Sequence, residues 1–246
     1  MLNRLSRRCY ALPSTKTADR PSLGAVCGDR LTLRIDCGNS PAHDALMREA
    51  MRTAGLPPAA LTAVTHSHWD HTFGMCAADH PVIACSRTQA QLQRMTAWRW
   101  TPEAMQKRLE TREDIPFCHQ EMLVEYPDPA RIRVRTADIV VSGDTDVDLG
   151  GVTVSLLLLP SSHTDDCMAM LVREEGVLYL GDITYEDLHH DPECLHTRRY
   201  RQLMDALAAL DFTIAVPGHQ EPMSKQELLS DMADMLTCGE ALLLDD

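Results

Sequence analysis

Apolar positions in the first third of the chain alternate between a strand pattern and a helix pattern. Leu31–Ile35 shows the two-residue alternation of a strand and ends at a tight turn. Ser40-Pro41 then has the residue types of an N-cap and a first helical turn, and Gly55 is a stop signal. Leu61–Thr65 is a short apolar run typical of a buried strand. The predicted buried face of the intervening helix consists of Ala42, Leu46, Met47, Ala50 and Met51.

Residues 86–110 are helical in pattern. Apolar side chains recur at every third residue over Leu92–Trp98. Thr101-Pro102 then supplies an N-cap and a first-turn proline that start a new helical segment. The following residues, 111–130, are rich in proline and acids and favour no single element. We predict a helical insertion at about 86–130.

The last part of the chain returns to strands and ends in helices. Strand signals run over Ile132–Leu159 and are broken at Ser142–Asp144 and at Gly150-Gly151. Two strands are then predicted, at Met168–Val172 and Val177–Leu180. A helix follows at Tyr200–Leu210 and a strand at Phe212–Val216. The capping box Ser224–Glu227 opens a last helix. Strands in two runs, each followed by helices, predict an α+β protein.

Composition and charge restrict the function classes. The 246 residues are 44% apolar and 24% charged, as in ordinary globular proteins, so we expect one domain over residues 1–246. No apolar run approaches the about 18 residues that a membrane helix needs. A formal net charge of −13 disfavours nucleic acid as a partner. We expect a small-molecule substrate and leave a homo-oligomer open.

The cysteines and the N-terminal segment bear on the compartment. Nine cysteines, without any Cys-x-x-Cys pair, predict reduced thiols in a cytoplasmic protein rather than a disulfide framework. The N-terminal segment is basic and has no acidic residue before Asp19. An organelle-targeting segment is the alternative, but no apolar core follows, so we expect a basic first strand.

Metal-ligand residue types are concentrated in Thr65–His71, directly after a predicted strand. His66 and His68 project to one face of an extended segment and can hold one ion together. Asp70 and His71 lie beyond them and can serve a second ion. Imidazole nitrogens and carboxylate oxygens suit Zn²⁺, Fe or Mn.

Three more ligand types, His163, Asp182 and His219, each follow a predicted strand. A side chain at the end of a strand is held rigidly, and neighbouring strands present such side chains at one edge of a sheet. The recurrence of a strand followed by a ligand predicts a shared metal site.

At these residues the chain resembles the metallo-β-lactamase-fold superfamily of metal-dependent hydrolases. The matching motifs are Thr65–His71, Ser162-His163-Thr164, Leu180-Gly181-Asp182, Pro217-Gly218-His219 and the early Ile35-Asp36-Cys37-Gly38. The resemblance covers about residues 23–83 and 132–222 and implies a four-layer αββα sandwich with a dinuclear metal site.

The resemblance also implies a ligand set for two divalent ions, with zinc expected and iron or manganese as alternatives. Its members are His66, His68 and His163 for the first ion, Asp70, His71 and His219 for the second, and Asp182 as the bridge. Asp36 is implied to orient a ligand rather than to bind metal.

The branch of the superfamily is less clear. Ser162 precedes His163, where the family often has glycine, and Asp165–Cys167 follows in place of the frequent Gly-Ser. The chain ends soon after His219, so we expect no glutathione-binding helical domain like that of typical glyoxalase II enzymes. Dinuclear lactamases lack the bridging aspartate, so Asp182 favours the glyoxalase II and lactonase-like branch.

The expected chemistry is hydrolysis by a hydroxide that bridges two cations, because these lower the pKa of bound water. Asp70 is the expected proton acceptor. Tyr185 lies three residues after Asp182, where lactonases of this superfamily carry a tyrosine that hydrogen-bonds the substrate carbonyl; packing near Tyr200 is the alternative. Gly-x-Ser-x-Gly is absent, and Cys167 is interpreted as a small buried residue.

The predicted function is hydrolysis of a small ester, lactone or thioester, with β-lactams less favoured. Alternatives are a mononuclear iron oxygenase that resembles the persulfide dioxygenases and uses only the three-histidine site, and a small-phosphodiester hydrolase. A non-catalytic binding module is a third class. The insertion carries Trp98 and Trp100 and is expected over or beside the metal cleft, as a substrate lid or else as a dimer contact or packed layer.

Overall fold

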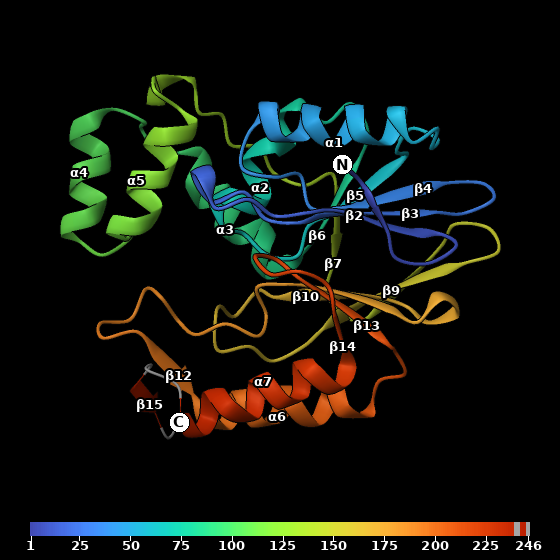
Figure 1. The fold of residues 1–246 in the computed structure, drawn as a ribbon. Helices are drawn as coiled ribbons and strands as arrows, with labels where there is room; N and C mark the ends of the chain where they lie inside the picture. The colour runs from blue at the N-terminus through green and yellow to red at the C-terminus, as the bar shows by residue number, and fades with distance from the viewer. Residues whose placement is uncertain (239–241, 245–246) are drawn as a thin grey trace.

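Two β-sheets lie face to face in the computed structural model, and helices cover the outer face of each sheet (Figure 1). The structure describes residues 1–238 and 242–244. Helix, sheet, sheet and helix follow one another from the top to the bottom of Figure 1. The fold is therefore the α+β, four-layer αββα sandwich that the sequence predicts.

The first sheet changes from antiparallel to parallel pairing across its width. Its strands are β1 (Asn3–Arg4), β2 (Cys9–Leu12), β3 (Leu23–Cys27), β4 (Thr32–Ile35), β5 (Leu61–Ala63), β6 (Val82–Cys85) and β7 (Ile139–Val141), in this spatial order. The pairs from β1 to β4 are antiparallel and those from β4 to β7 are parallel. Parallel neighbours present their carboxyl ends at the same edge, which is where the predicted ligands begin.

The second sheet contains one parallel pair among antiparallel ones. Its strands, in spatial order, are β14 (Met223–Ser224), β13 (Ile214–Pro217), β11 (Val177–Gly181), β10 (Met168–Val172), β9 (Thr153–Leu158) and β8 (Thr145–Asp148). Only β11 and β13 run parallel among these described strands. A separate parallel pair joins β12 (Cys194–His196) to β15 (Leu242–Leu244).

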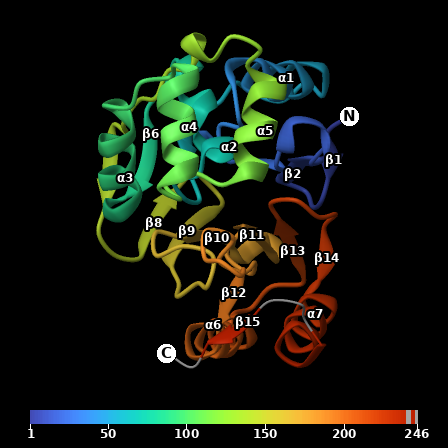
Figure 2. The ribbon, with the colours of Figure 1, turned by 90° about the vertical axis from the view of Figure 1, so that its left-hand side faces the viewer.

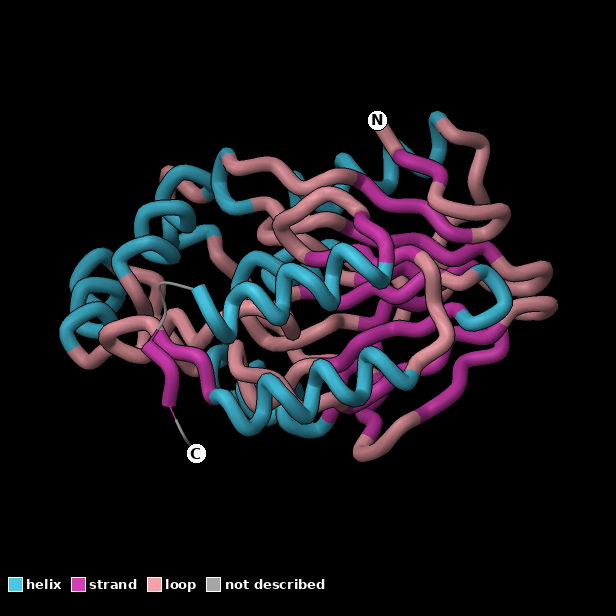
Figure 3. Tube along the Cα trace, turned by 60° about the horizontal axis from the view of Figure 1, so that its bottom comes forward, coloured by secondary structure: helices cyan, strands magenta, loops and turns pink. Residues whose placement is uncertain are grey.

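The helices divide between the two outer layers and one end of the molecule. The first sheet is covered by α1 (Pro41–Thr53), α2 (Trp69–Thr72) and α3 (Ser86–Thr96). The second is covered by α6 (Thr197–Ala209) and α7 (Lys225–Cys238), which run across the front of Figure 3. The end that faces the viewer in Figure 2 carries α4 (Pro102–Glu110) and α5 (Pro116–Glu125). None of the helices within the described ranges is long and apolar enough to cross a membrane.

The predicted helix starts are confirmed by their hydrogen bonds. Ser40 Oγ accepts from the backbone N–H of the third residue of α1 at 3.0 Å, and Thr101 Oγ1 does the same at α4 at 3.3 Å. Both halves of the capping box are made, from Ser224 N to Glu227 Oε2 at 2.8 Å and from Glu227 N to Ser224 Oγ at 3.2 Å. The predicted strand over Ile132–Leu159 is wrong in its first part, because β7 begins only at Ile139.

The buried face of α1 differs in part from its prediction. Met47 is buried as expected, but Ala42 and Leu46 are exposed. Asp44 is buried in their place, with its carboxylate 2.6 Å from the guanidinium of Arg34 in β4, and both side chains are almost fully buried. A buried pair of opposite charges can therefore occupy a helix face that an apolar pattern assigns to hydrophobic residues.

Candidate metal centre

The segment Thr65–His71 leaves the carboxyl end of β5. Because β4 and β5 are parallel, with Ile35 opposite Ala63, the chain emerges from both strands at the same edge. Asp36, directly after β4, accepts hydrogen bonds from Thr65 N at 2.7 Å and from Thr65 Oγ1 at 2.9 Å. Its φ of 60° lies in the left-handed region, which costs a non-glycine residue free energy and marks a constrained site. The start of the ligand segment is thus held by a buried carboxylate.

The second sheet supplies two ligand types by the same geometry. Gly181 at the end of β11 pairs with Pro217 at the end of β13, so Asp182 and His219 emerge next to each other. A Cβ on Gly218 would meet Asp182 Oδ1 at 1.9 Å, so no larger residue fits there. Gly181 itself has a φ of 54°. Gly218 therefore lets the Asp182 carboxylate approach, and Gly181 combines a left-handed backbone with close approach to the Thr65 side chain.

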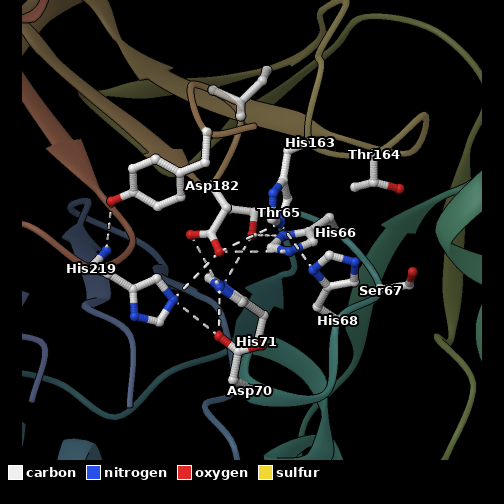
Figure 4. Close-up of polar contacts among 12 residues, drawn as sticks. Thr65, His66, Ser67, His68, Asp70, His71, His163, Thr164, Asp182 and His219 are labelled. Atoms are coloured by element: carbon white, nitrogen blue, oxygen red, sulfur yellow. Dashed lines mark hydrogen bonds and ion pairs between the residues drawn. The ribbon is translucent and has the colours of Figure 1, made fainter. Parts of the chain in front are cut away.

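His66, His68 and His163 form the first ligand group, on one side of Asp182 in Figure 4. One nitrogen from each ring lies within 4.8 Å of the others, and His68 Nδ1 is 2.9 Å from His163 Nε2. His163 Nδ1 donates to the backbone carbonyl of Glu186 at 2.9 Å, which leaves Nε2 as the ligand nitrogen. His66 Nε2 is buried and has no hydrogen-bond partner within the described part of the chain.

Burial keeps two of these rings neutral. It lowers the pKa of His66 well below the ordinary value, and the neighbouring His71 and His68 rings lower it further. Burial and the His163 ring do the same to the pKa of His68. Neutral imidazole is the form that binds a metal ion, so His66 and His68 can take a cation without first losing protons.

Asp70, His71, Asp182 and His219 form the second ligand group, on the other side of Figure 4. Asp70 Oδ2 lies 3.1 Å from Nε2 of both His71 and His219. His71 Nδ1 lies 2.7 Å from Asp36 Oδ2 and donates to it, which directs Nε2 into the group. A carboxylate behind a ligand imidazole fixes the tautomer and raises the basicity of the ring, as at many metal sites.

Charge is shared across the second group. Burial alone would raise the pKa of Asp70 and of Asp182, but attraction to His71 and His219 outweighs it and holds both carboxyls below their usual range. Burial alone would lower the pKa of the two histidines, yet the carboxylates raise it well above the ordinary value. Protons therefore balance the buried carboxylates, and a divalent cation would take the place of these protons.

Asp182 faces both groups. Its Oδ2 lies 3.7 Å from His163 Nε2 and 4.0 Å from His66 Nε2 in the first group. In the second, Oδ1 lies 3.3 Å from His71 Nε2 and Oδ2 lies 3.4 Å from His219 Nε2. The structure thus brings every predicted ligand into one of two adjoining groups, with the predicted bridging residue between them.

Tyr185 lies at the centre rather than against the helix near Tyr200. Its hydroxyl accepts a hydrogen bond from the backbone N–H of His219 at 3.1 Å, and its ring centroid lies 6.3 Å from that of His163. The hydroxyl of Tyr200 instead donates to the backbone carbonyl of Thr184 at 3.1 Å. Burial raises the pKa of Tyr185, so the phenol keeps its proton and can donate a hydrogen bond.

Asp19 is a residue of this centre that sequence reasoning missed. Its Oδ1 lies 3.3 Å from His219 Nδ1, opposite the side that faces Asp70. Burial and the Asp70 carboxylate raise the pKa of Asp19 to about 7. It ends a short turn, Thr17–Asp19, with a φ of 46°. No motif surrounds Asp19, and a positive φ at an aspartate leaves no signal in the sequence.

Two cavities meet at the first ligand group, because His68 and His163 line both. The larger, of about 460 Å³, extends toward the insertion and is bounded by Trp98 and Trp100. The smaller, of about 210 Å³, is lined by Tyr185 and by Asp70, Asp182 and His219 of the second group. The insertion therefore lies beside the ligand groups, as expected.

Trp98 and Trp100, the aromatic wall of the larger cavity, pack against a buried arginine. The guanidinium of Arg108 lies 4.6 Å from the ring centroids of both Trp98 and Trp100. Trp100 also meets Phe73 edge to face, with centroids 5.3 Å apart. Stacking of a buried cation on two rings favours a rigid wall.

Three comparisons relate the chain to known proteins. The family model of the metallo-beta-lactamase superfamily matches residues 25–219. No curated protein is significantly similar to the chain in sequence.

Solved structures share the fold at low sequence identity. A metallo-beta-lactamase from Pontibacter korlensis superposes with a TM-score of 0.68 at 15% identity, over 96% of this chain and 99% of that one. A subclass B3 metallo-beta-lactamase of Bradyrhizobium japonicum gives a TM-score of 0.65 at 14% identity, over 96% and 90%. An archaeal superfamily protein from Sulfolobus tokodaii gives 0.60 at 17% identity, over 98% and 90%.

Proposed function

The chain belongs to the metallo-beta-lactamase superfamily and is a metallo-hydrolase of that family, and we propose that it hydrolyses a small ester, lactone or thioester at two divalent metal ions. The observation that carries this proposal is the position of the Asp182 carboxylate, which faces both ligand groups within 4.0 Å. A carboxylate between two ligand sets is the arrangement expected of the glyoxalase II and lactonase-like branch, to which we assign the chain.

The ligand atoms fit this assignment. His66, His68 and His163 would hold one ion, Asp70, His71 and His219 the other, and Asp182 both. Zinc is the first choice, since nitrogen and carboxylate oxygen are its usual ligands, and iron or manganese could replace it. Two such ions would supply Lewis acidity that lowers the pKa of a bound water and polarises the substrate carbonyl.

The side chains around the ions have separate tasks. Asp70 is ionised and faces the second group, so it would accept a proton from the attacking water and pass it to the leaving group. Tyr185 keeps its proton and would donate a hydrogen bond to the oxygen on which negative charge develops. Neither task requires movement of the backbone, because both residues already face the ligand groups.

The cavity supports a small substrate with an apolar part. Trp98 and Trp100 border a space of about 460 Å³ that opens onto His68 and His163. We assign this space to the acyl or leaving group of the substrate, and the insertion at about 86–130 to its wall, within one domain over residues 1–246. The cysteine content is the argument for a cytoplasmic location.

The test is an activity panel with protein stripped of metal and reloaded with Zn²⁺, Mn²⁺ or Fe²⁺. We expect hydrolysis of thioesters, lactones or simple esters to return with two ions in the two groups, and β-lactams and phosphodiesters to be poor substrates. Turnover of none of the three carbonyl classes, or activity restored by one iron ion together with O₂ uptake, would refute the proposal. A Trp98→Ala variant should change substrate preference without loss of metal.

A further inference from the structure

A third group of ligand-type side chains lies beside the first ligand group. One ligand atom each of Asp187, Cys194 and His196 lies within 4.8 Å of the other two. We propose that these three residues bind a further transition-metal ion, of the zinc class, in addition to the ions of the two groups described above. None of the three belongs to either of those groups.

The backbone directs these side chains toward one another. Asp187 and Cys194 face each other in an antiparallel bridge, with N–H to carbonyl distances of 2.8 and 3.2 Å. Directly opposed residues of such a bridge present their side chains on the same face. Cys194 and His196 are two apart on β12, which again places them on one face. Secondary structure therefore brings the three ligand types together.

The positions of the three ligand atoms suit a metal site better than a Cys-His-Asp catalytic triad. His196 Nε2 lies 3.8 Å from Cys194 Sγ and 3.8 Å from Asp187 Oδ2. In a catalytic relay the nucleophile and the carboxylate sit on opposite ring nitrogens, whereas here both face the same one. Ligands about 2.0–2.3 Å from a tetrahedral zinc lie roughly 3.3–3.6 Å apart. The two 3.8 Å distances from His196 Nε2 would therefore need only a small contraction.

The ligand set selects the class of ion. A thiolate beside an imidazole and a carboxylate suits zinc, cobalt or ferrous iron, and it disfavours calcium and magnesium, which take oxygen ligands. Three protein ligands leave a fourth position for water or another small ligand. Asp187 and His196 line the cavity of about 460 Å³, so the fourth ligand could come from a molecule in that cavity.

Hydrogen bonds around His163 also link the third group to the first. The backbone N–H of His196 donates to Ser162 Oγ at 2.6 Å, next to His163 in the chain. His163 Nδ1 in turn donates to the carbonyl of Glu186, next to Asp187. An ion here would therefore hold the segment that orients a ligand of the first group.

Cobalt substitution tests the site directly. Thiolate bound to Co²⁺ gives a near-ultraviolet charge-transfer band, and the first two groups contain only histidine and aspartate. Protein stripped of metal and loaded with Co²⁺ should show this band. Cys194→Ser should abolish it, and Asp187→Asn, which keeps the oxygen that caps the turn, should lower the apparent Co²⁺ affinity at least ~10-fold.

Matched variants separate this site from the hydrolytic centre. Cys118 also lines the large cavity but lies outside every ligand group found in the described residues, so Cys118→Ser should keep the band. His66→Ala and His219→Ala should keep it even where hydrolysis is lost. Absence of the band in loaded wild-type protein, its persistence in Cys194→Ser, or its loss in Cys118→Ser would overturn the proposal. If Cys194→Ser does not fold, an unchanged Co²⁺ affinity in Asp187→Asn has the same meaning.

Discussion

The two ligand groups of the centre lie side by side but differ in charge. The first consists of His66, His68 and His163, and burial keeps the first two of these rings neutral. The second contains two carboxylates whose charge is balanced by histidines with raised pKa values. The same fold thus builds one group in which His66 and His68 need no proton release to take a cation and one group that exchanges protons for it.

The groups that contact the ligand histidines from behind also differ in charge between the two ligand groups. His163 donates to the neutral backbone carbonyl of Glu186. By contrast, His71 has the carboxylate of Asp36 behind it, and His219 has that of Asp19. A carboxylate behind a ligand imidazole strengthens its hold on a cation, and because the pKa of Asp19 is raised to about 7, Asp19 does so above that pH. We infer that the second group gains more affinity from charge, whereas His68 and His163 of the first group border the large cavity.

The largest effect is expected from Asp182, the residue that both groups share. Asp182→Ala should lower kcat by at least ~10³-fold, about 4 kcal/mol of barrier, because both ions lose a ligand. Metal analysis after dialysis should show weaker binding in both groups. Asp211→Ala, a change at an exposed carboxylate between α6 and β13, is the control. Loss of metal from one group alone would mean that Asp182 does not join them.

Asp70 should separate the groups. Asp70→Asn removes an ionised carboxylate from the second group, and general acid–base catalysis of the kind assigned to it is worth ~10²–10⁴ in rate. We expect a loss of turnover in that range, weaker metal binding in the second group and unchanged binding in the first. Near wild-type turnover with the best substrate would contradict the role of Asp70 as proton acceptor.

Proton release upon metal binding should follow the charge difference. His71 and His219 have raised pKa values, so near neutral pH they hold protons that an incoming ion must displace, and the affinity of the second group should rise by about tenfold per pH unit for each proton released. The lowered pKa values of His66 and His68 predict no such rise from these two ligands of the first group.

Calorimetry in buffers of different ionisation enthalpy can measure this difference. His66→Ala leaves the second group intact and His219→Ala the first, both in a Cys194→Ser background that removes the thiol. Zn²⁺ binding should release protons in the former protein and few in the latter. Equal release from both would show that the two groups do not differ as described.

Tyr185 should have the smallest effect. Tyr185→Phe deletes one hydrogen-bond donor, and we expect a rate loss of ~10-fold, about 1.4 kcal/mol, with metal content and melting temperature nearly unchanged. Tyr200→Phe is the matched control, since the hydroxyl of Tyr200 bonds Thr184 away from the ligands. It should lower stability by about 1 kcal/mol and leave kcat intact. The opposite outcome would make Tyr185 structural.

The sequence predicts the ligand groups well because their residues occur in short motifs at strand ends. His66, His68, Asp70 and His71 follow one strand directly, so their convergence depends only on local geometry. The fold class follows from the order of strands and helices in the same way. Capped helices such as α1 and α4 are also predictable, because their first residues carry the signal.

The remaining parts depend on contacts between distant residues, which no local pattern records. Asp19 reaches His219 from a turn far away in the chain, and the buried pair of Arg34 and Asp44 contradicts the apolar pattern of α1. Helix α5 has no clear apolar stripe: Met122 is buried, whereas Phe117, Leu123 and Val124 are exposed. The third ligand group depends on the antiparallel bridge between Asp187 and Cys194, which no local sequence pattern predicts.

Anomalous diffraction from crystals of the Zn²⁺-loaded protein, recorded at the zinc edge, tests the central claim most directly. We predict one ion held by His66, His68 and His163 and a second held by Asp70, His71 and His219, about 3.5–4 Å apart as in other two-metal sites. Both ions should contact the Asp182 carboxylate. A single ion among these residues at saturating zinc, or two ions without Asp182 between them, would contradict it.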